Sequence, residues 1–255
     1  MACCTYGALL LGDDPAPQCH PVTELPRVQP HVAALAQPVA EAQTYVQQQP
    51  AANLDETGWR EHSRRAWLWV CATPQVVVFL VLATRGAQGA KTLLGEAFPG
   101  IAGSDRWSAY NWLAPQRRQL CWAHLKRDFQ KLVERGGESA RLGQALLEQA
   151  QELFRLWGGV RDGTLSRGDF QVKVQPLRAR VQALLREGTT LAHAKTRHTC
   201  ENILHLKVAL WTFVFVEGVE PTNNHAERCL RRAVLWRGVV LARRVRRGVC
   251  LSSAS

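Results

Sequence analysis

The stretch RAWLWVCATPQVVVFLVL, residues 65–82, does most to decide the fold of this chain. Its first part, 65–71, is rich in aromatic and β-branched residues, and its second part, 75–82, is a continuous apolar run. Both compositions favour strands, and Pro74 between them predicts a turn. We therefore expect two neighbouring strands here, preceded by a shorter strand at 51–54.

The segments after this stretch alternate in pattern. Beyond about residue 126 the pattern is helical as far as 217, with turn signals at Gly136-Gly137, Gly158-Gly159, Pro176 and Gly188. Three consecutive strands followed by alternation predict an α/β protein, with a mixed sheet and helices on its faces. The alternating segments are a helix at 86–98, a strand at 101–104, a helix at 107–113 and a strand at 118–123.

The N-terminal part has a different texture. Seven of the twelve prolines fall within residues 1–50, and a proline-dense stretch resists both helix and sheet. We expect residues 1–30 to be irregular and residues 32–49 to form one helix despite Pro38.

The net charge of +11 suggests a polyanionic partner. This charge is unevenly spread, because the 28 residues after Glu227 contain eight arginines and no acid. Residues 1–50 are acidic, with one arginine against four carboxylates. The middle of the chain is therefore only mildly basic.

The eight cysteines follow no disulfide framework, and we expect them to be reduced thiols of a cytoplasmic protein. The N-terminus lacks a basic segment before its short apolar run, so a signal peptide is not expected. No stretch approaches the roughly 18–20 apolar residues that a membrane span needs. We expect no membrane partner.

Three carboxylates stand in distinctive settings: Asp55 in LDETGWR, Asp105 in SDRWSAY and Glu227 in PTNNHAER. Asp55 and Asp105 each follow a strand-like run, and functional groups of open α/β sheets gather at strand ends. Glu227 lies on a segment rich in amides and arginines. Carboxylates are hard ligands for Mg²⁺, and two ions roughly 3.5–4 Å apart promote in-line displacement at phosphodiesters. The three carboxylates are thus candidates for a catalytic metal site.

Each carboxylate also has a purely structural interpretation. Asp55 could be a turn residue before Thr57-Gly58, and Asp105 could cap a helix that starts near Trp107. Glu227 could form a capping box with Asn224, three residues before it. Taken singly, these interpretations are as good as the catalytic one. Together they do not explain why all three carboxylates occur where an active site would need them.

Residues near these carboxylates are candidates for supporting roles. Cys121 and His124 have the spacing of half a zinc site, but structural zinc needs four ligands, so zinc is not favoured. We expect His124 and Arg127 to face the DNA or the metal, with core packing of Cys121 and Trp122 as the alternative.

The segment that carries Glu227 has its own pattern. Asn224, Glu227, Arg228 and Arg231 recur at three- and four-residue steps, which places them on one helix face. Arginines there could bind phosphate. The alternative is an ordinary solvated charged face.

These motifs, together with LCWAHLKRDF at 120–129, resemble successive signatures of the insertion-sequence-sixty-six type (IS66) transposases of bacteria. The resemblance covers roughly residues 32–237. It implies an RNase H-like fold and a DDE site with Asp55 and Asp105 as the aspartates and Glu227 as the glutamate. The spacing of 122 positions from Asp105 to Glu227 then matches a large all-helical insertion.

The resemblance also implies cofactors and partners. Two Mg²⁺ ions, for which Mn²⁺ can substitute, would serve nicking and strand transfer on transposon ends and target DNA. A homodimer and association with the nucleoid would follow by analogy.

The same comparison predicts five segments: an N-terminal remnant of an upstream domain (1–50), the first part of the core (51–125), the helical insertion (126–217), the Glu227 helix (218–237) and a basic tail (238–255). The arginine-, glycine- and valine-rich tail has the composition that a frameshift in GC-rich DNA produces. We therefore expect a truncated copy whose two ends lie outside the family pattern.

Two other functions remain open from the sequence. A non-catalytic remnant would bind DNA in a salt-sensitive way without metal-dependent cleavage. An RNase H-like nuclease would cleave DNA without producing joined strands.

Overall fold

The computed structural model describes residues 6–9, 29–61 and 64–249 of the chain. The chain packs into two compact units. We call residues 1–99 together with 224–255 the sheet unit, and residues 100–223 the helical unit. The five-segment division predicted from the sequence stays a prediction. It was drawn from composition and motifs, whereas these two units are defined by packing, so the units do not test it. The mixed α/β class expected from the sequence is confirmed.

The described strands of the sheet unit pair in antiparallel fashion in the order β1-β4-β3-β2. Their bounds are β1 Tyr6–Leu9, β2 Ala51–Glu61, β3 Arg64–Ala72 and β4 Val77–Leu82. The strands expected at 65–71 and 75–82 are confirmed as β3 and β4. The shorter strand expected at 51–54 is instead eleven residues long, because its pairing with β3 runs from Asn53↔Ala72 to Glu61↔Arg64.

One face of this sheet is covered by helix α2 (Ala87–Leu94). A Cβ at Gly89 would lie 2.5 Å from the indole of Trp69, so the helix backbone rests directly on that ring. Helix α1 (Gln29–Gln47) lies beside α2, where Gln43 and Gln47 donate hydrogen bonds to the carbonyls of Thr92 and Leu93.

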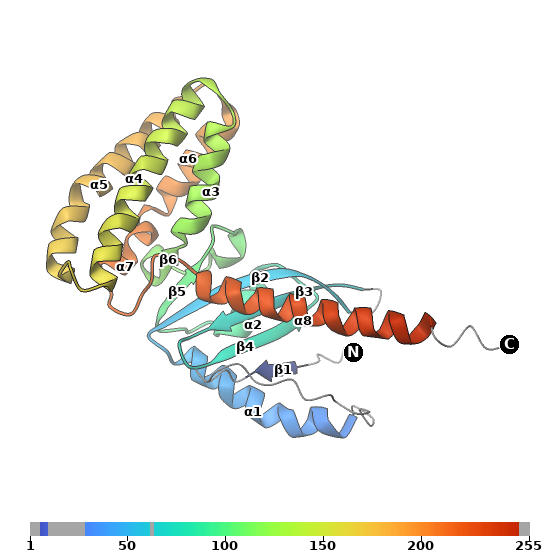
Figure 1. Cartoon of the computed structure of the whole chain (residues 1–255). Helices are drawn as coiled ribbons and strands as arrows, with labels where there is room; N and C mark the ends of the chain where they lie inside the picture. Colours follow the sequence, from blue (N-terminus) through green and yellow to red (C-terminus); the bar gives the residue numbers. More distant parts are fainter. Residues whose placement is uncertain (1–5, 10–28, 62–63, 250–255) are drawn as a thin grey trace. The chain divides into compact units, whose positions relative to one another are not determined.

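The opposite face is covered by α8 (Asn224–Val249), which lies along β2 and β3 in Figure 1. Ala226, Cys229 and Leu230 of α8 are buried at three- and four-residue steps, which is the spacing of one helix face. They pack against Leu68, Val70, Ala72 and Val77 of the sheet. The C-terminal helix is therefore part of the core of a unit whose strands lie near the other end of the chain.

The helical unit contains a parallel strand pair and most of the helices. Strands β5 (Ile101–Ser104) and β6 (Arg118–Leu120) pair with each other and confirm the strands expected there. Short 3-10 helices at Ser108–Tyr110 and Pro115–Arg117 connect them. The helices that follow are α3 Trp122–Val133, α4 Gly137–Arg161, α5 Arg167–Gly188, α6 Ala194–His205, the 3-10 helix η3 Lys207–Leu210 and α7 Thr212–Phe215.

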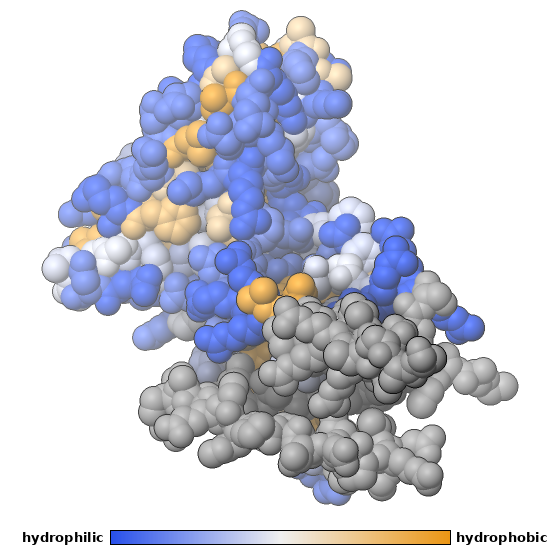
Figure 2. All heavy atoms as spheres, turned by 45° about the vertical axis from the view of Figure 1, so that its right-hand side comes forward, coloured by the Kyte–Doolittle hydropathy of each residue, from blue (hydrophilic) through white to orange (hydrophobic). Residues whose placement is uncertain are grey.

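Close backbone approaches hold these helices together. A Cβ at Gly143 of α4 would lie 2.7 Å from the backbone oxygen of Phe129 in α3, and Gly188 of α5 is packed against Cys200 of α6. Each helix buries an apolar stripe, and on the face shown in Figure 2 hydrophilic side chains cover most of this unit.

Local signals in the sequence were overruled at several points. Helix α4 runs through Gly158-Gly159 and α5 runs through Pro176, whereas turns were predicted at both places. In α4, the packing of the apolar stripe outweighs the modest free-energy cost of glycine within a helix. In α5, Pro176 lies on the exposed side of the helix. Gly136 and Gly188 do mark helix ends, as predicted.

Other expectations were wrong in extent. The helix expected at 107–113 is only the 3-10 turn 108–110, and the strand expected to reach 123 stops at Leu120 because α3 begins at Trp122. Residues 6–9 form β1 within a stretch expected to be irregular, since β4 offers them an open edge. Residues 10–28, also expected to be irregular, lie outside the described residues. No helix within the described ranges has the length and apolar character needed to cross a bilayer.

Candidate active site

Asp55 lies in the middle of β2, directly opposite Val70 of β3. The prediction that it ends a strand is therefore wrong, and so is the alternative that it precedes a turn. The residues after it, including Thr57 and Trp59, continue the pairing as far as Glu61, because β3 supplies a partner along that whole length. Asp55 is half-buried.

The register fixes which face of the sheet Asp55 occupies. Residues opposite each other on paired antiparallel strands point to the same side. Val70 belongs to the cluster packed against α8, so Asp55 lies on the α8 face. Its neighbour Glu56 lies on the other face, where it is buried and ion-paired with Arg85 at 3.0 Å.

Glu227 is in the first turn of α8 and is half-buried. Contacts at two points align this helix with the sheet. Near its start, Nε2 of His225 lies 3.2 Å from the carbonyl oxygen of Thr73, just after β3. Further along, Arg237 donates a 2.7 Å hydrogen bond to the carbonyl of Arg60 and stacks 4.2 Å from the ring centroid of Trp59.

Element geometry then places Glu227 relative to Asp55. The ten residues from Glu227 to Arg237 span about 15 Å of helix. The five residues from Asp55 to Arg60 span about 17 Å of strand. Because Arg237 contacts Arg60, Glu227 lies roughly level with Asp55. Along the sheet, the first turn of α8 therefore begins at about the level of Asp55, and the convergence of the two carboxylates stays a prediction.

Asp105 lies in the helical unit, immediately after β5, as predicted. Its Oδ1 accepts a 2.8 Å hydrogen bond from the backbone N–H of Trp107, which gives it a structural role in this loop, but the N-cap of the 3-10 helix that follows is Trp107 rather than Asp105. This role is compatible with metal binding, because a carboxylate has two oxygens and this hydrogen bond uses only one of them. The convergence of Asp105 with Asp55 and Glu227 stays a prediction.

Arg118 is a residue that the sequence reasoning missed. It is completely buried beneath Asp105, where Nη2 donates 3.2 Å to the Asp105 carbonyl and Nη1 donates 3.1 Å to Oδ1 of Asn111. Burial lowers the pKa of the guanidinium to about 10, against the opposing charges of Asp105 and Tyr110. The signal that the sequence offers is an arginine at the start of the apolar run RQLCW.

A second missed contact involves Arg106, the residue after Asp105. Its guanidinium makes two hydrogen bonds to Oδ2 of Asp128 on α3, at 3.1 and 2.5 Å, and Lys131 reaches Oδ1 of the same carboxylate at 3.2 Å. The loop that carries Asp105 is therefore tied to α3 on one side and to Arg118 on the other.

The start of α3 confirms core packing for Cys121 and Trp122, which are both buried. The backbone N–H of Cys121 donates 2.8 Å to Ser104 O, and its thiol accepts from the backbone N–H of Asn223 at 3.4 Å. Trp122 donates from its indole to Leu210 O at 2.8 Å.

The remaining supporting residues lie on accessible surfaces. His124 is half-buried, whereas Arg127 on α3 is exposed. On α8, Asn224, Arg228 and Arg231 are exposed. Contact with DNA stays a prediction for all five, and for the α8 residues so does the alternative of a solvated charged face.

The four described cysteines, 71, 121, 200 and 229, are buried, and none of them forms a disulfide within the described residues. Cys3, Cys4, Cys19 and Cys250 lie outside the described residues. Burial raises the pKa of the Cys71 thiol to about 12 and that of Cys200 to about 11.

The fold and these positions together describe an α/β protein in which an arginine-rich helix covers the sheet face that carries Asp55. The transposase IS66 family matches residues 26–249, which is most of the chain. The chain therefore belongs to the IS66 family of transposases.

The family match is longer than the resemblance seen in the sequence. It continues past Arg237 to residue 249, where α8 also ends. The prediction that the family pattern stops near 237 is therefore wrong for residues 238–249. Their arginine-, valine- and alanine-rich composition is compatible with a basic helix.

Among curated proteins, the chain is similar to "Uncharacterized protein y4qI" of Sinorhizobium fredii (strain NBRC 101917 / NGR234), with 29% identity over 197 residues. The alignment covers 68% of this chain and 36% of that protein, so the chain spans about a third of its relative's length. No solved structure matches the chain.

Proposed function

We propose that this chain is a DDE transposase that nicks DNA and transfers strands, with Asp55, Asp105 and Glu227 as its catalytic carboxylates. The observation that carries the proposal is that α8, the helix of Glu227, covers the sheet face on which Asp55 lies. The two residues are 172 positions apart in the chain, so only the fold brings this helix to that face.

The order of elements supports an RNase H-like fold. Three successive antiparallel strands, β2 to β4, precede the parallel pair β5 and β6. Helices α3 to α7 then occupy most of the interval between Asp105 and Glu227, as expected for an all-helical insertion, before α8 returns to the sheet unit.

Chain connectivity also supports the proposal. Ser104, next to Asp105, is hydrogen-bonded to Cys121, and the Cys121 thiol holds Asn223. Asn223 is four residues before Glu227 in the chain. The last residue of the helical unit before α8 is therefore held by the thiol at the start of α3.

The donor set fits magnesium or manganese. Asp55 and Glu227 supply half-buried carboxylates, and Asp105 has one oxygen outside its hydrogen bond with the Trp107 N–H. Carboxylate oxygens are the ligands that Mg²⁺ prefers. When bound, two such ions would activate the attacking oxygen and stabilise the leaving oxygen.

The residues of the chain have distinct tasks in this proposal. Asp55, Asp105 and Glu227 hold the metal ions, and Arg118 and Arg106 fix the loop that carries Asp105. Exposed Arg228 and Arg231 are placed to bind phosphate in the first turns of α8, and His124 and Arg127 support the DNA. Water attacks in nicking and a DNA 3′-hydroxyl attacks in joining, with two copies acting on two transposon ends.

The test is a nicking and joining assay on DNA that carries the sequences flanking the gene, with Mg²⁺ or Mn²⁺. We expect Asp55→Asn, Asp105→Asn and Glu227→Gln each to lower the rate at least about 100-fold, because each removes a metal-holding charge. The exposed Glu217→Gln is the control and should keep full activity. Activity that survives in any of the three variants would contradict the assignment.

Two other outcomes would replace the proposal. Salt-sensitive DNA binding without metal-dependent cleavage would identify a non-catalytic remnant. Cleavage that never yields joined strands would identify a nuclease.

A further inference from the structure

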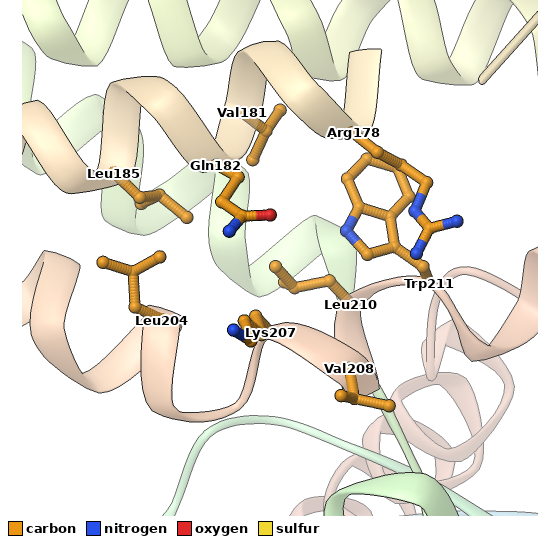
Figure 3. A pocket seen from close by; sticks show the side chains of 9 residues that line it. All are labelled: Arg178, Val181, Gln182, Leu185, Leu204, Lys207, Val208, Leu210 and Trp211. Carbon is orange, nitrogen blue, oxygen red and sulfur yellow. The ribbon is translucent and has the colours of Figure 1, made fainter. Parts of the chain in front are cut away.

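The helical unit has a pocket between α5 and the segment from the end of α6 through η3. Its volume is about 130 Å³. Figure 3 shows the side chains of two segments facing each other across it. The lining residues are Arg178, Val181, Gln182, Leu185, Leu204, Lys207, Val208, Leu210 and Trp211.

The charges on this pocket have one sign. Of the nine lining residues, only Arg178 and Lys207 are charged, and both are cations. Lys207 is exposed, whereas Arg178 is partly buried, and burial lowers the pKa of its guanidinium. Arg178 is a partly buried cation among apolar side chains, and no carboxylate lines the pocket. Such a site favours an anionic ligand.

Aromatic rings flank the same arginine. The guanidinium carbon of Arg178 lies 5.9 Å from the ring centroid of Trp211 and 5.0 Å from that of Phe215. Trp211 is buried, but Phe215 is 51% exposed, an unusual state for a phenylalanine. An exposed ring beside a held guanidinium is a stacking surface for a flat partner.

Size and lining restrict what the pocket can hold. A protein cavity of about 150 Å³ accommodates benzene, so this somewhat smaller pocket can take no more than one six-membered ring. The walls formed by Val181, Leu185 and Leu204 would contact its faces, and the Gln182 amide can donate to and accept from a polar ring edge. A flat ring with a polar edge and an attached anion describes a pyrimidine nucleotide.

We propose that this pocket receives an unpaired pyrimidine of single-stranded DNA, with the next base stacked on Phe215 and the phosphates held by Arg178 and Lys207. The proposal rests on the proposed function, because strand transfer exposes unpaired DNA. A base within a duplex cannot enter, since its ring is stacked and paired. The site is thus selective for single strands.

The test measures binding of a fluorescein-labelled oligothymidylate by the full-length chain, using anisotropy in EDTA so that no cleavage occurs. We expect Phe215→Ala to weaken binding about tenfold, the usual effect of removing one stacked base. Arg178→Gln and Lys207→Gln should each weaken binding and reduce the slope of log affinity against log salt by about 0.7.

Matched controls separate the pocket from the general charge of the surface. Arg180→Gln removes a cation two residues from Arg178, on the other side of α5. Val172→Ala removes an exposed apolar side chain of the same helix. Both should bind like the parent chain, and circular dichroism would check that every variant is folded.

The outcomes distinguish this inference from the proposed function. Equal competition by duplex DNA, or unchanged binding by Phe215→Ala and Arg178→Gln, would overturn the pocket proposal whatever the catalytic result. Asp105→Asn should abolish nicking and leave oligothymidylate binding intact. Binding that depends on Phe215 in a chain without nicking activity would support the pocket and reject the catalytic proposal.

Discussion

Arg118 is a buried charge whose hydrogen bonds go to neutral oxygens, the carbonyl of Asp105 and the amide of Asn111. Removing the guanidinium leaves the oxygens that it contacts without these hydrogen bonds, which costs free energy in a buried setting. We expect Arg118→Met to lower the free energy of unfolding by about 2–4 kcal/mol, measured by urea denaturation.

The adjacent Arg117 provides the control, because it is exposed. Arg117→Met should change the unfolding free energy by less than about 0.5 kcal/mol. Equal effects of the two substitutions would show that the burial of Arg118 does not contribute to the free energy of unfolding.

Cys71 predicts a dependence of stability on pH. Its pKa is raised from 9.0 to about 12 by burial, so the folded state retains the proton more strongly than the unfolded chain does. This contribution is complete below pH 9 and is lost as the pH rises from 9 towards 12.

The measurement is the unfolding free energy of the parent chain and of Cys71→Ala between pH 7 and 11. The difference between them should change by up to about 1.4 kcal/mol per pH unit above pH 9 and stay constant below it. A constant difference over the whole range would contradict the burial effect on this thiol.

Single residues show where sequence reasoning succeeds. Asp105 follows a short apolar strand, and Pro99-Gly100 mark where that strand begins. Asp55 was placed at a strand end because Thr57-Gly58 resembles a turn, but the partner strand extends the pairing through it. The position of Asp55 within β2 depends on its pairing with Val70 of β3, and the local composition around Asp55 does not reveal this pairing.

At the scale of elements, α8 is held over the sheet by Arg237. Its guanidinium both stacks on Trp59 and hydrogen-bonds the Arg60 carbonyl. We expect Arg237→Ala to lower the unfolding free energy by about 1–2 kcal/mol, measured by denaturant unfolding. Exposed Arg232→Ala on the same helix is the control and should have little effect.

A double-mutant cycle with Trp59→Ala isolates the stacking. The coupling energy should be at least about 0.5 kcal/mol. Additive effects would mean that the two side chains act separately.

The helical unit depends on glycines where helices touch. Gly143→Ala would place a methyl group 2.7 Å from a backbone oxygen of α3, and backbone cannot move aside as a flexible side chain can. We expect a loss of about 1–3 kcal/mol in thermal or denaturant unfolding.

Gly168→Ala is the comparison, because its added Cβ would meet only Ser166 Oγ at 3.9 Å. That substitution should be neutral or slightly stabilising, since alanine is the better helix former. A cost as large as that of Gly143→Ala would refute the contact argument.

Element existence was easier to predict than element ends. The apolar runs of β3 and β4 and the stripes of the long helices were visible in the sequence. The turns predicted at Pro176 and Gly158-Gly159 are wrong. The local tendency of Pro and Gly to break a helix is outweighed by the burial of apolar side chains, such as Phe170 and Val174 in α5.

At the scale of the whole molecule, the family and the helical interval between Asp105 and Glu227 could be predicted, because their motifs are local in sequence. The division into two compact units could not. The sheet unit is built from both ends of the chain, and only the packing of Ala226, Cys229 and Leu230 against the sheet reveals it.

This discontinuity has a consequence during synthesis. Leu68, Val70, Ala72 and Val77 leave the ribosome long before the helix that covers them, since 149 residues separate Val77 from Ala226. At the usual rates of translation this interval lasts roughly 7–30 s. The nascent sheet therefore exposes an apolar face while the helical unit forms, and chaperone binding should be strongest in that interval. The sheet face that carries Asp55 is therefore covered only after the residues of α8, Asn224–Val249, have been made.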